Sequence, residues 1–341
     1  MSSITKQPPT VITCRAAVAW GAGQDLVIEE VEVSPPQPQE IRIKVAFTSL
    51  CGSDLSALES KVTDLLIPTE LNPVLIRSQT MDVYTPLSGC AVKVSPAAPL
   101  EKLCLLSCGA ATGVTLLRSV EMSMHYIKGD CKFSLLSTNN NPSGLGAAWN
   151  VADITKGSTA VIFGLGTVGL SVAQGAKIRG ASQIIGVDTN PDKYEKAKDF
   201  GITDFINPAD YSEPIQEVIK RATNGGADYS FECTGNTEVV TAALHSCCDG
   251  WGLAVALGVP KGKPEISAHY ALSLGGRTLK GSLFGGWKPK SDLPSLVEMY
   301  MKQEIFIVEF ITHHLPFEDI NKAFKLMREG KCLRYVIHMP K

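Results

Sequence analysis

Residues 158–188 read STAVIFGLGTVGLSVAQGAKIRGASQIIGVD, and this stretch decides the fold. An apolar run suited to a buried strand is followed by a glycine-rich turn, a helical stretch and a second apolar strand. The turn, residues 164–169, has the spacing GxGxxG and joins the first strand directly to the helix, as in known dinucleotide sites. The stretch therefore predicts a βαβ unit with a phosphate site at the N-terminus of its helix.

The candidate phosphate-binding residues of this turn are Gly164, Gly166, Val168 and Gly169. Gly164 permits the tight turn, Gly166 lets the backbone approach a pyrophosphate, and Gly169 lets the helix pack closely on the strand. The turn alone is weak evidence, because an ordinary glycine-rich turn can share its spacing. A second signal is needed.

Asp188 supplies that signal at the end of the second strand, nineteen positions after Gly169. A carboxylate there accepts hydrogen bonds from the adenosine ribose hydroxyls and repels a 2′-phosphate. The sequence therefore predicts NAD rather than NADP as the coenzyme. The alternative is that Asp188 only caps the helix that begins in DTNPDK.

Working outward, four more strand-like segments alternate with helical stretches up to about residue 285. They read DFIN, ADYSFECTG, GLAVALGV and TLKGSLFGG. Together with the first two strands they predict a six-stranded, doubly wound parallel sheet of the Rossmann α/β class. Thr234 and Val259 follow strands of this sheet, and we expect them to line the coenzyme crevice at its carboxyl edge.

The composition limits the classes of partner. The 341 residues are 44% hydrophobic and 19% charged, enough apolar material for two domains. The net charge is −2 without a basic run, so neither nucleic acid nor an acidic membrane is expected. No apolar run is long enough to span a membrane and the N-terminal residues lack a signal-peptide pattern, which favours the cytoplasm. Ten scattered cysteines are expected to be reduced and mostly buried.

Long blocks of the sequence resemble plant zinc-dependent alcohol dehydrogenase-like proteins of the medium-chain dehydrogenase/reductase family. The resemblance covers residues 11 to about 60, about 83 to 113 and 145–341, and includes DYSFECTGN, LKGSLFGGWK and ITHHLPFEDINKAF. It implies an NAD-dependent enzyme that uses zinc to transfer hydride between an alcohol or aldehyde substrate and the coenzyme. It also implies a homodimer.

The resemblance implies a discontinuous, GroES-like catalytic domain around the nucleotide domain. Residues 1–144 and 284–341 form the catalytic domain, and residues 145–283 form the NAD-binding Rossmann domain. Lys193 matches the family lysine beside the adenosine ribose, and Arg334 matches the arginine that contacts the pyrophosphate. The alternative for both is an exposed, solvated surface charge.

The family's catalytic zinc is held by two thiolates and one imidazole, with the fourth position open for substrate. Cys51 and Cys108 match the two thiolate ligands. Ser53 matches the hydroxyl that begins the proton relay, and Thr112 matches a residue near the nicotinamide. On spacing alone, the two cysteines are more often buried apolar residues than ligands.

The catalytic half departs from the family in two stretches. Residues 61–82 match none of its pattern and contain no histidine where the imidazole ligand should stand. No cysteine lies between Cys51 and Cys90, so a four-cysteine structural zinc site is excluded. About thirty residues, 114–144, interrupt a segment that is continuous in the family, and we expect a flexible insert. Any zinc ion would need His125, Cys131, Glu70 or water to complete its shell.

Our hypothesis is that both departures come from altered exon use, with a block missing after Ser60 and a retained stretch that begins at Val114. Family-like sequence resumes abruptly on both sides of each. The alternative is an error in the gene structure, which sequencing of the full transcript distinguishes. The missing block removes strands of the catalytic barrel, which would leave unpaired strand edges.

Three functions fit these observations. The first is a zinc-assisted, NAD-dependent alcohol dehydrogenase. The second is a catalytically impaired isoform that binds NAD(H) without a complete zinc site and dimerises through the edge of its nucleotide sheet. The third is a zinc-free, NADPH-dependent reductase, against which Asp188, Cys51 and Cys108 all argue.

Overall fold

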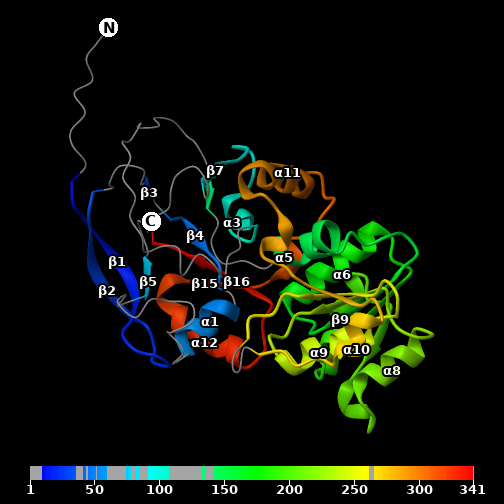
Figure 1. The fold of residues 1–341 in the computed structure, drawn as a ribbon. Coiled ribbons are helices and arrows are strands. Elements are labelled where there is room, and N and C mark those ends of the chain that lie inside the picture. Colours follow the sequence, from blue (N-terminus) through cyan, green and yellow to red (C-terminus); the bar gives the residue numbers. More distant parts are fainter. Residues whose placement is uncertain are drawn as a thin grey trace. The chain divides into compact units, whose positions relative to one another are not determined.

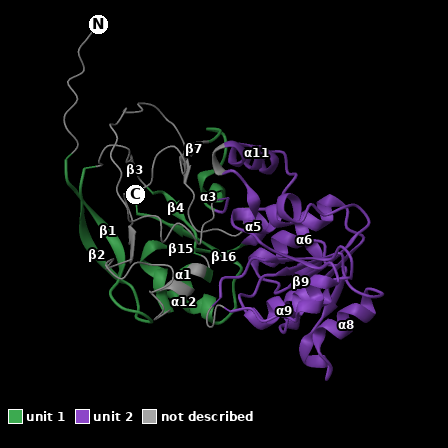
Figure 2. Ribbon diagram, in the orientation of Figure 1, with its two compact units in different colours: residues 1–104, 110–138, 311–341 green, residues 105–109, 139–310 purple. Residues whose placement is uncertain are grey.

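The computed structural model describes residues 10–35, 41–43, 45–50, 52–59, 74–77, 81–83, 91–106, 133–135, 141–260 and 265–340. Two compact units divide the chain (Figure 2). Unit 1 comprises residues 1–104, 110–138 and 311–341, and unit 2 comprises residues 105–109 and 139–310. Unit 1 thus contains segments from both the N-terminal and the C-terminal part of the chain. Unit 2 runs on to Phe310, beyond the boundary predicted near Phe284.

A six-stranded parallel sheet forms the centre of unit 2 (Figure 1). Its order is β11-β10-β9-β12-β13-β14, and all neighbouring strands are parallel. The bounds are β9 Thr159–Phe163, β10 Gln183–Val187, β11 Asp204–Ile206, β12 Tyr229–Glu232, β13 Leu253–Ala256 and β14 Thr278–Gly281. The predicted six strands and the Rossmann-type α/β class are confirmed.

The strand order places the crossover helices on opposite faces of this sheet. The chain moves outward from β9 to β11, then returns beside β9 with β12 and moves outward the other way. Because parallel crossovers are right-handed, α6 and α9 cover opposite faces. The helices are α5 Asn141–Gly146, α6 Thr167–Arg179, α7 Tyr194–Asp199, α8 Ile215–Ala222, α9 Thr237–Ser246, α10 Tyr270–Leu274 and α11 Pro289–Met301, with the π-helix η1 Ala147–Val151.

Apolar side chains of the sheet and of α8 and α9 form the main core of this unit. Val161, Ile185 and Ile219 are fully buried within it. The burial follows from sequence, because α8 places its apolar residues on one side and its charged residues on the other. A buried parallel sheet needs such cover on both faces.

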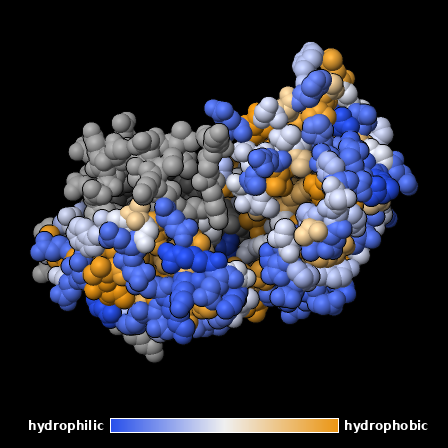
Figure 3. Space-filling model, turned by 90° about the horizontal axis from the view of Figure 1, so that it is seen from below, coloured by the Kyte–Doolittle hydropathy of each residue, from blue (hydrophilic) through white to orange (hydrophobic). Residues whose placement is uncertain are grey.

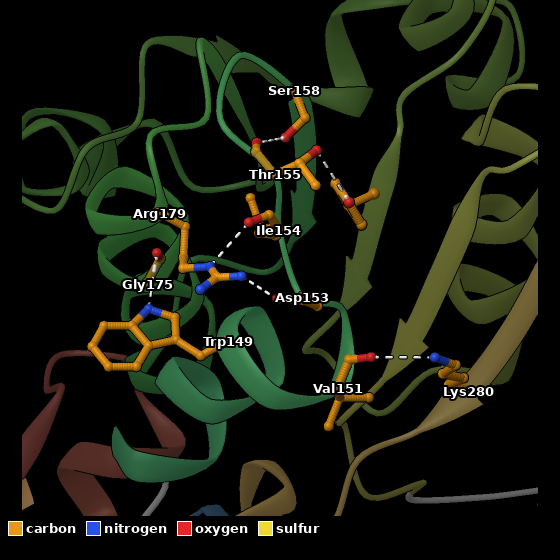
Figure 4. Close-up of polar contacts among 10 residues, drawn as sticks. Trp149, Val151, Asp153, Ile154, Thr155, Ser158, Gly175, Arg179 and Lys280 are labelled. Carbon is orange, nitrogen blue, oxygen red and sulfur yellow. Dashed lines mark hydrogen bonds and ion pairs between the residues drawn. The ribbon is translucent and has the colours of Figure 1, made fainter.

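The segment that leads into β9 is fastened to α6 and to the sheet by polar contacts (Figure 4). The Trp149 indole donates to the Gly175 carbonyl at 3.1 Å. Arg179 donates from Nε to the Ile154 carbonyl at 3.0 Å and forms an ion pair with Asp153. On the opposite side, Lys280 Nζ donates to the Val151 carbonyl at 3.3 Å. These contacts fix the start of β9 and therefore the position of the glycine-rich turn at its end.

Unit 1 consists of small sheets and short helices. Its sheets have the orders β2-β1-β5, β15-β16-β4, β3-β6 and β7-β8. The strands are β1 Ile12–Ala19, β2 Val27–Val33, β3 Ile41–Ile43, β4 Phe47–Thr48, β5 Val74–Arg77, β6 Met81–Val83, β7 Ala91–Lys93, β8 Phe133–Leu135, β15 Ile311–Pro316 and β16 Arg334–His338. The helices are α1 Gly52–Glu59, α3 Leu100–Leu103 and α12 Ile320–Arg328.

One apolar core joins the N-terminal and C-terminal segments of unit 1. Leu55 and Leu58 of α1 pack with Phe324 of α12, and Ala17 of β1 packs in the same cluster. Arg328 on α12 forms an ion pair with Glu59 at 2.7 Å. Strand β8 lies inside the stretch expected to be a flexible insert and pairs antiparallel with β7. The flexibility of the insert stays a prediction. Most of 61–82 and 114–144 lies outside the described residues.

Over the coloured part of the face drawn in Figure 3, hydrophilic and apolar residues are interspersed. No helix in the described ranges combines the length and the apolar character needed to cross a membrane.

Candidate dinucleotide site

Four neighbouring strands of unit 2 end at one level of the sheet. Phe163 of β9 pairs with Val187 of β10 and with Glu232 of β12, and Glu232 pairs with Ala256 of β13. The predicted coenzyme residues of this unit follow these strand ends. The carboxyl edge of a doubly wound sheet is where such ligands bind, at the point where the strand order reverses. Here that point lies between β9 and β12.

Gly164 makes the turn after β9 in a conformation that suits glycine. Its φ is +90°, in the left-handed region, and its amide donates to the Val187 carbonyl at 2.8 Å. A Cβ at this position would lie 2.7 Å from the Thr234 Cγ2 atom. Both strain and crowding therefore exclude a side chain, as the sequence predicts.

Gly166 and Gly169 differ in what surrounds them. No heavy atom lies within 4 Å of a Cβ built on Gly166, the residue that precedes α6. A Cβ on Gly169 would collide with the carbonyl oxygen of Gly164. Gly169 therefore allows α6 to pack against the turn, and Gly166 leaves open space at a helix N-terminus. The backbone amides and dipole of that terminus favour an anion, so the turn fits a pyrophosphate. Val168 lies in the first turn of α6.

Asp188 lies directly after β10, and its carboxylate reaches back to the glycine-rich turn. Oδ2 accepts from the Leu165 amide at 2.8 Å and from Lys193 Nζ at 2.7 Å. Oδ1 accepts from the Asn190 amide at 2.9 Å. The Asp188 side chain is 7% exposed and that of Lys193 is 33% exposed. Asp188 and Lys193, which were both predicted to lie beside the adenosine ribose, are therefore in contact with each other.

The capping alternative for Asp188 can be compared with what the structure shows. Asn190, not Asp188, caps the short helix Pro191–Lys193, since its side chain accepts from the Asp192 amide at 3.0 Å. A carboxylate offers about four acceptor positions. With three in use, the Asp188 carboxylate has one acceptor position left for a further hydrogen bond, and Lys193 Nζ lies beside it.

Glu232 organises the loop after β12, and the sequence analysis missed it. The residue is 1% exposed, and its Oε1 accepts from the Thr234 amide at 2.6 Å, the Thr234 hydroxyl at 2.5 Å and the Gly235 amide at 2.8 Å. A glutamate at the end of an otherwise apolar strand was the available signal, because a buried carboxylate requires such partners. Glu232 therefore holds Thr234 beside Gly164.

Val259 belongs to the loop after β13 and lies against the loop after β12. A Cβ on Gly235 would collide with the Val259 carbonyl group. The two loops that carry Thr234 and Val259 are therefore in close contact, at the carboxyl edge where both residues were expected.

Arg334 is not the exposed surface charge that the alternative interpretation assumed. It is 2% exposed, and within unit 1 its Nη1 donates to the Leu50 carbonyl at 2.8 Å. The assumption was wrong because Arg334 begins β16, the central strand of the β15-β16-β4 sheet, whose next three residues are fully buried. Its contact with a pyrophosphate stays a prediction.

The predicted catalytic half of the site is only partly described. Cys51, Cys108 and Thr112 lie outside the described residues, as do His125, Cys131 and Glu70. Ser53 lies on α1, but its side chain is outside the description. The predicted zinc site therefore stays a prediction.

Several of the remaining cysteines have thiols with raised pKa values. Burial raises the pKa of Cys104 to about 12 and that of Cys247 to about 12, and it raises the pKa of Cys233 well above the usual range. Such thiols are protonated at neutral pH and are poor nucleophiles and metal ligands. Among the described cysteines, Cys14 and Cys247 are buried, whereas Cys104, Cys233, Cys248 and Cys332 are partly buried, so the expectation of mostly buried cysteines holds for only two of these six.

The fold and the glycine-rich turn define the class: a Rossmann-type α/β protein with a second, discontinuous unit. Comparisons with known proteins agree. A family profile described as zinc-binding dehydrogenase matches residues 167–302. Alcohol dehydrogenase-like 6 of Arabidopsis thaliana is 52% identical over 409 aligned positions, covering 100% of this chain and 99% of the relative. Alcohol dehydrogenase 1 of Zea mays is 39% identical over 96% of this chain and 98% of its own length.

A solved structure with the same fold is the benzyl alcohol dehydrogenase of Acinetobacter calcoaceticus, with a TM-score of 0.72, 23% identity and coverage of 96% of this chain and 100% of that chain. The chain therefore belongs to the family of zinc-type alcohol dehydrogenases of the medium-chain dehydrogenase/reductase group. It is an alcohol dehydrogenase-like oxidoreductase.

Proposed function

We propose that this protein transfers hydride between a small alcohol or aldehyde and NAD, in the cytoplasm. The observation that carries the choice of coenzyme is Asp188, a nearly buried carboxylate at the end of β10 that contacts the glycine-rich turn. A negative charge there favours the free ribose hydroxyls of NAD and opposes the 2′-phosphate of NADP.

The residues of unit 2 have separate tasks in this proposal. The backbone at Gly166 receives the pyrophosphate, while Asp188 and Lys193 receive the adenosine ribose. Thr234 and Val259, on the contacting loops after β12 and β13, face the coenzyme at the carboxyl edge of the sheet in this proposal. When bound, the nicotinamide ring supplies the hydride acceptor or donor.

Replacing Asp188 with serine is expected to reduce the preference for NADH over NADPH by about 10- to 100-fold, the value of one or two charged hydrogen bonds. Dissociation constants of both coenzymes, measured by fluorescence titration, test this. Asp192→Asn is the matched control. Asp192 is an acidic residue close to Asp188 in sequence, and its backbone amide, which donates to Asn190 Oδ1, is kept in the variant. An unchanged ratio in Asp188→Ser would contradict the assignment of NAD.

A second candidate function is an isoform that binds NAD(H) but catalyses weakly. It is supported by the length of the alignment with the Arabidopsis relative, which spans 409 positions against the 341 residues of this chain. That relative therefore has residues without a counterpart here. Altered exon use after Ser60 and from Val114 accounts for the difference in this proposal.

The proposal includes only two of the three protein ligands of the family's catalytic zinc. Cys51 and Cys108 provide two thiol ligands of the family's catalytic site, but residues 61–82 provide no histidine for the third. The donor set is thus incomplete by comparison with the family, and we derive no catalytic step from it. The predicted absence of a structural zinc rests on the missing four-cysteine lobe.

We further propose a homodimer in which two copies join at β14. This strand is at the end of the sheet order, and no other strand in the described ranges pairs with its outer edge. Leu279 of β14 is 38% exposed, Leu283 just beyond it is 67% exposed, and Leu274 of α10 is 71% exposed. An open strand edge with exposed leucines favours pairing with a second copy.

The double substitution Leu279→Glu and Leu283→Glu is expected to weaken the dimer about 100-fold or more, because charges would be buried unpaired. Light scattering after size exclusion should report twice the chain mass of 36.5 kDa before the change and a single chain after it. Ile178→Glu on α6 is the control, since Ile178 is exposed but lies away from β14. A mass that is already that of one chain in the unmodified protein would exclude this dimer.

A further inference from the structure

Two imidazoles and one carboxylate converge in unit 1, on three elements that are far apart in sequence. Glu101 lies on α3, His314 on β15 and His338 at the end of β16. The Nδ1 atom of His314 is 3.2 Å from Glu101 Oε1 and 3.2 Å from His338 Nε2. All three potential ligand atoms lie within 4.8 Å of one another.

The sheet β15-β16-β4 determines this placement. His314 pairs with Val336 and Pro316 pairs with His338, so the two histidines lie two residues apart on one face of the parallel pair. His338 also pairs with Phe47 on β4, whose ring meets the imidazole edge-on at 5.2 Å. The backbone and an aromatic neighbour therefore hold the second imidazole in position.

The three potential ligand atoms around His314 suit a cation at this point. A ring nitrogen carries either a hydrogen or a lone pair. If His314 Nδ1 carries a hydrogen, this single N–H faces both Glu101 Oε1 and His338 Nε2, each at 3.2 Å. With a lone pair, it accepts from His338 but faces a carboxylate oxygen at 3.2 Å. A positive ion shared by the three atoms satisfies all of them.

The spacing matches the coordination shell of a small divalent metal. Zinc binds imidazole nitrogen and carboxylate oxygen at about 2.0–2.2 Å, which places tetrahedral ligands roughly 3.3 Å apart. Two of the three separations here are 3.2 Å. Imidazole with carboxylate suits Zn²⁺, Ni²⁺ and Cu²⁺. The His314 side chain is 44% exposed, so an ion can reach the site from water.

We propose that Glu101, His314 and His338 form a binding site for a divalent transition-metal ion. The site contains no thiol and shares no residue with the predicted zinc ligands Cys51 and Cys108. Lys102 opposes it, because its Nζ lies 3.0 Å from Glu101 Oε1. Removing that positive charge strengthens the site.

Titration calorimetry of the full chain with Ni²⁺ tests the proposal. We expect saturable binding of one Ni²⁺ ion per chain at Glu101, His314 and His338. His314→Ala and His338→Ala should each weaken that step at least about tenfold, since even loss of a residue that only supports a ligand costs 10- to 100-fold. Lys102→Gln should tighten it.

His313→Ala is the matched control, because its ring lies on the other face of β15 and packs against Tyr335 at 5.2 Å. Nickel binding should be unchanged in this variant. X-ray absorption of the loaded protein, which should show two imidazoles on nickel, gives a readout independent of any variant. Nickel that binds equally to the His314→Ala and unmodified proteins, or a spectrum dominated by sulfur, would overturn the proposal.

Discussion

Replacing Gly166 with alanine is expected to abolish NADH binding while leaving the protein folded. The new methyl group meets no protein atom within 4 Å, so the unfolding temperature should not change. The same space receives the pyrophosphate in our proposal, and a methyl group there blocks the approach of the phosphates to the backbone. Loss of about 100-fold or more in NADH affinity corresponds to losing charge-assisted hydrogen bonds.

Gly169→Ala is the contrasting change in the same turn. Its methyl group would collide with the Gly164 carbonyl oxygen, so the turn and α6 must separate. We expect destabilisation by about 1–3 kcal/mol, the usual cost of overpacking, together with weaker NADH binding. Thermal unfolding followed by circular dichroism distinguishes the two variants. Equal unfolding temperatures for both would contradict the geometry described for this turn.

The second large effect is expected from replacing Cys51, one of the two predicted thiol ligands of zinc. If the chain is an active zinc enzyme, Cys51→Ala should remove the bound zinc and lower alcohol-dependent NADH formation by about 1,000-fold, because a metal ion contributes several kcal/mol to stabilising the developing alkoxide. Elemental analysis and NADH absorbance measure both quantities. Cys332→Ala is the control, since burial raises the pKa of this thiol and no role in catalysis is predicted for it.

The unmodified chain decides between the two candidate functions in the same experiment. One zinc per chain with alcohol-dependent turnover supports the dehydrogenase. Absence of both, with NADH binding retained, supports the catalytically weak isoform. Measured preference for NADPH would instead favour the zinc-free reductase.

The nucleotide unit could be predicted from sequence because its signals are local. Each strand is a short apolar run, and GxGxxG with Asp188 fixes which strands come first. The ion pair of Asp188 with Lys193 and the close approach of Gly164 to Thr234 were not predicted, and the structure adds them.

The other unit could not be predicted to the same depth because its structure depends on distant pairings. Strand β8 has three residues and exists by pairing with β7 across some forty positions, which no local period reveals. The burial of Arg334 and the meeting of His314 with His338 likewise depend on the pairing of β15 with β16. Glu232 was missed because its partners are the backbone amides and the Thr234 hydroxyl of the loop that follows, whose conformation the sequence does not reveal.

The most direct test is a titration of the purified chain with NADH, followed by fluorescence and calorimetry. Saturation at one NADH per chain, with NADPH binding much more weakly, is the result that a pyrophosphate at Gly166 and a ribose at Asp188 predict. A folded protein that gives no saturable signal with NADH would contradict the proposed coenzyme site and with it the proposed function.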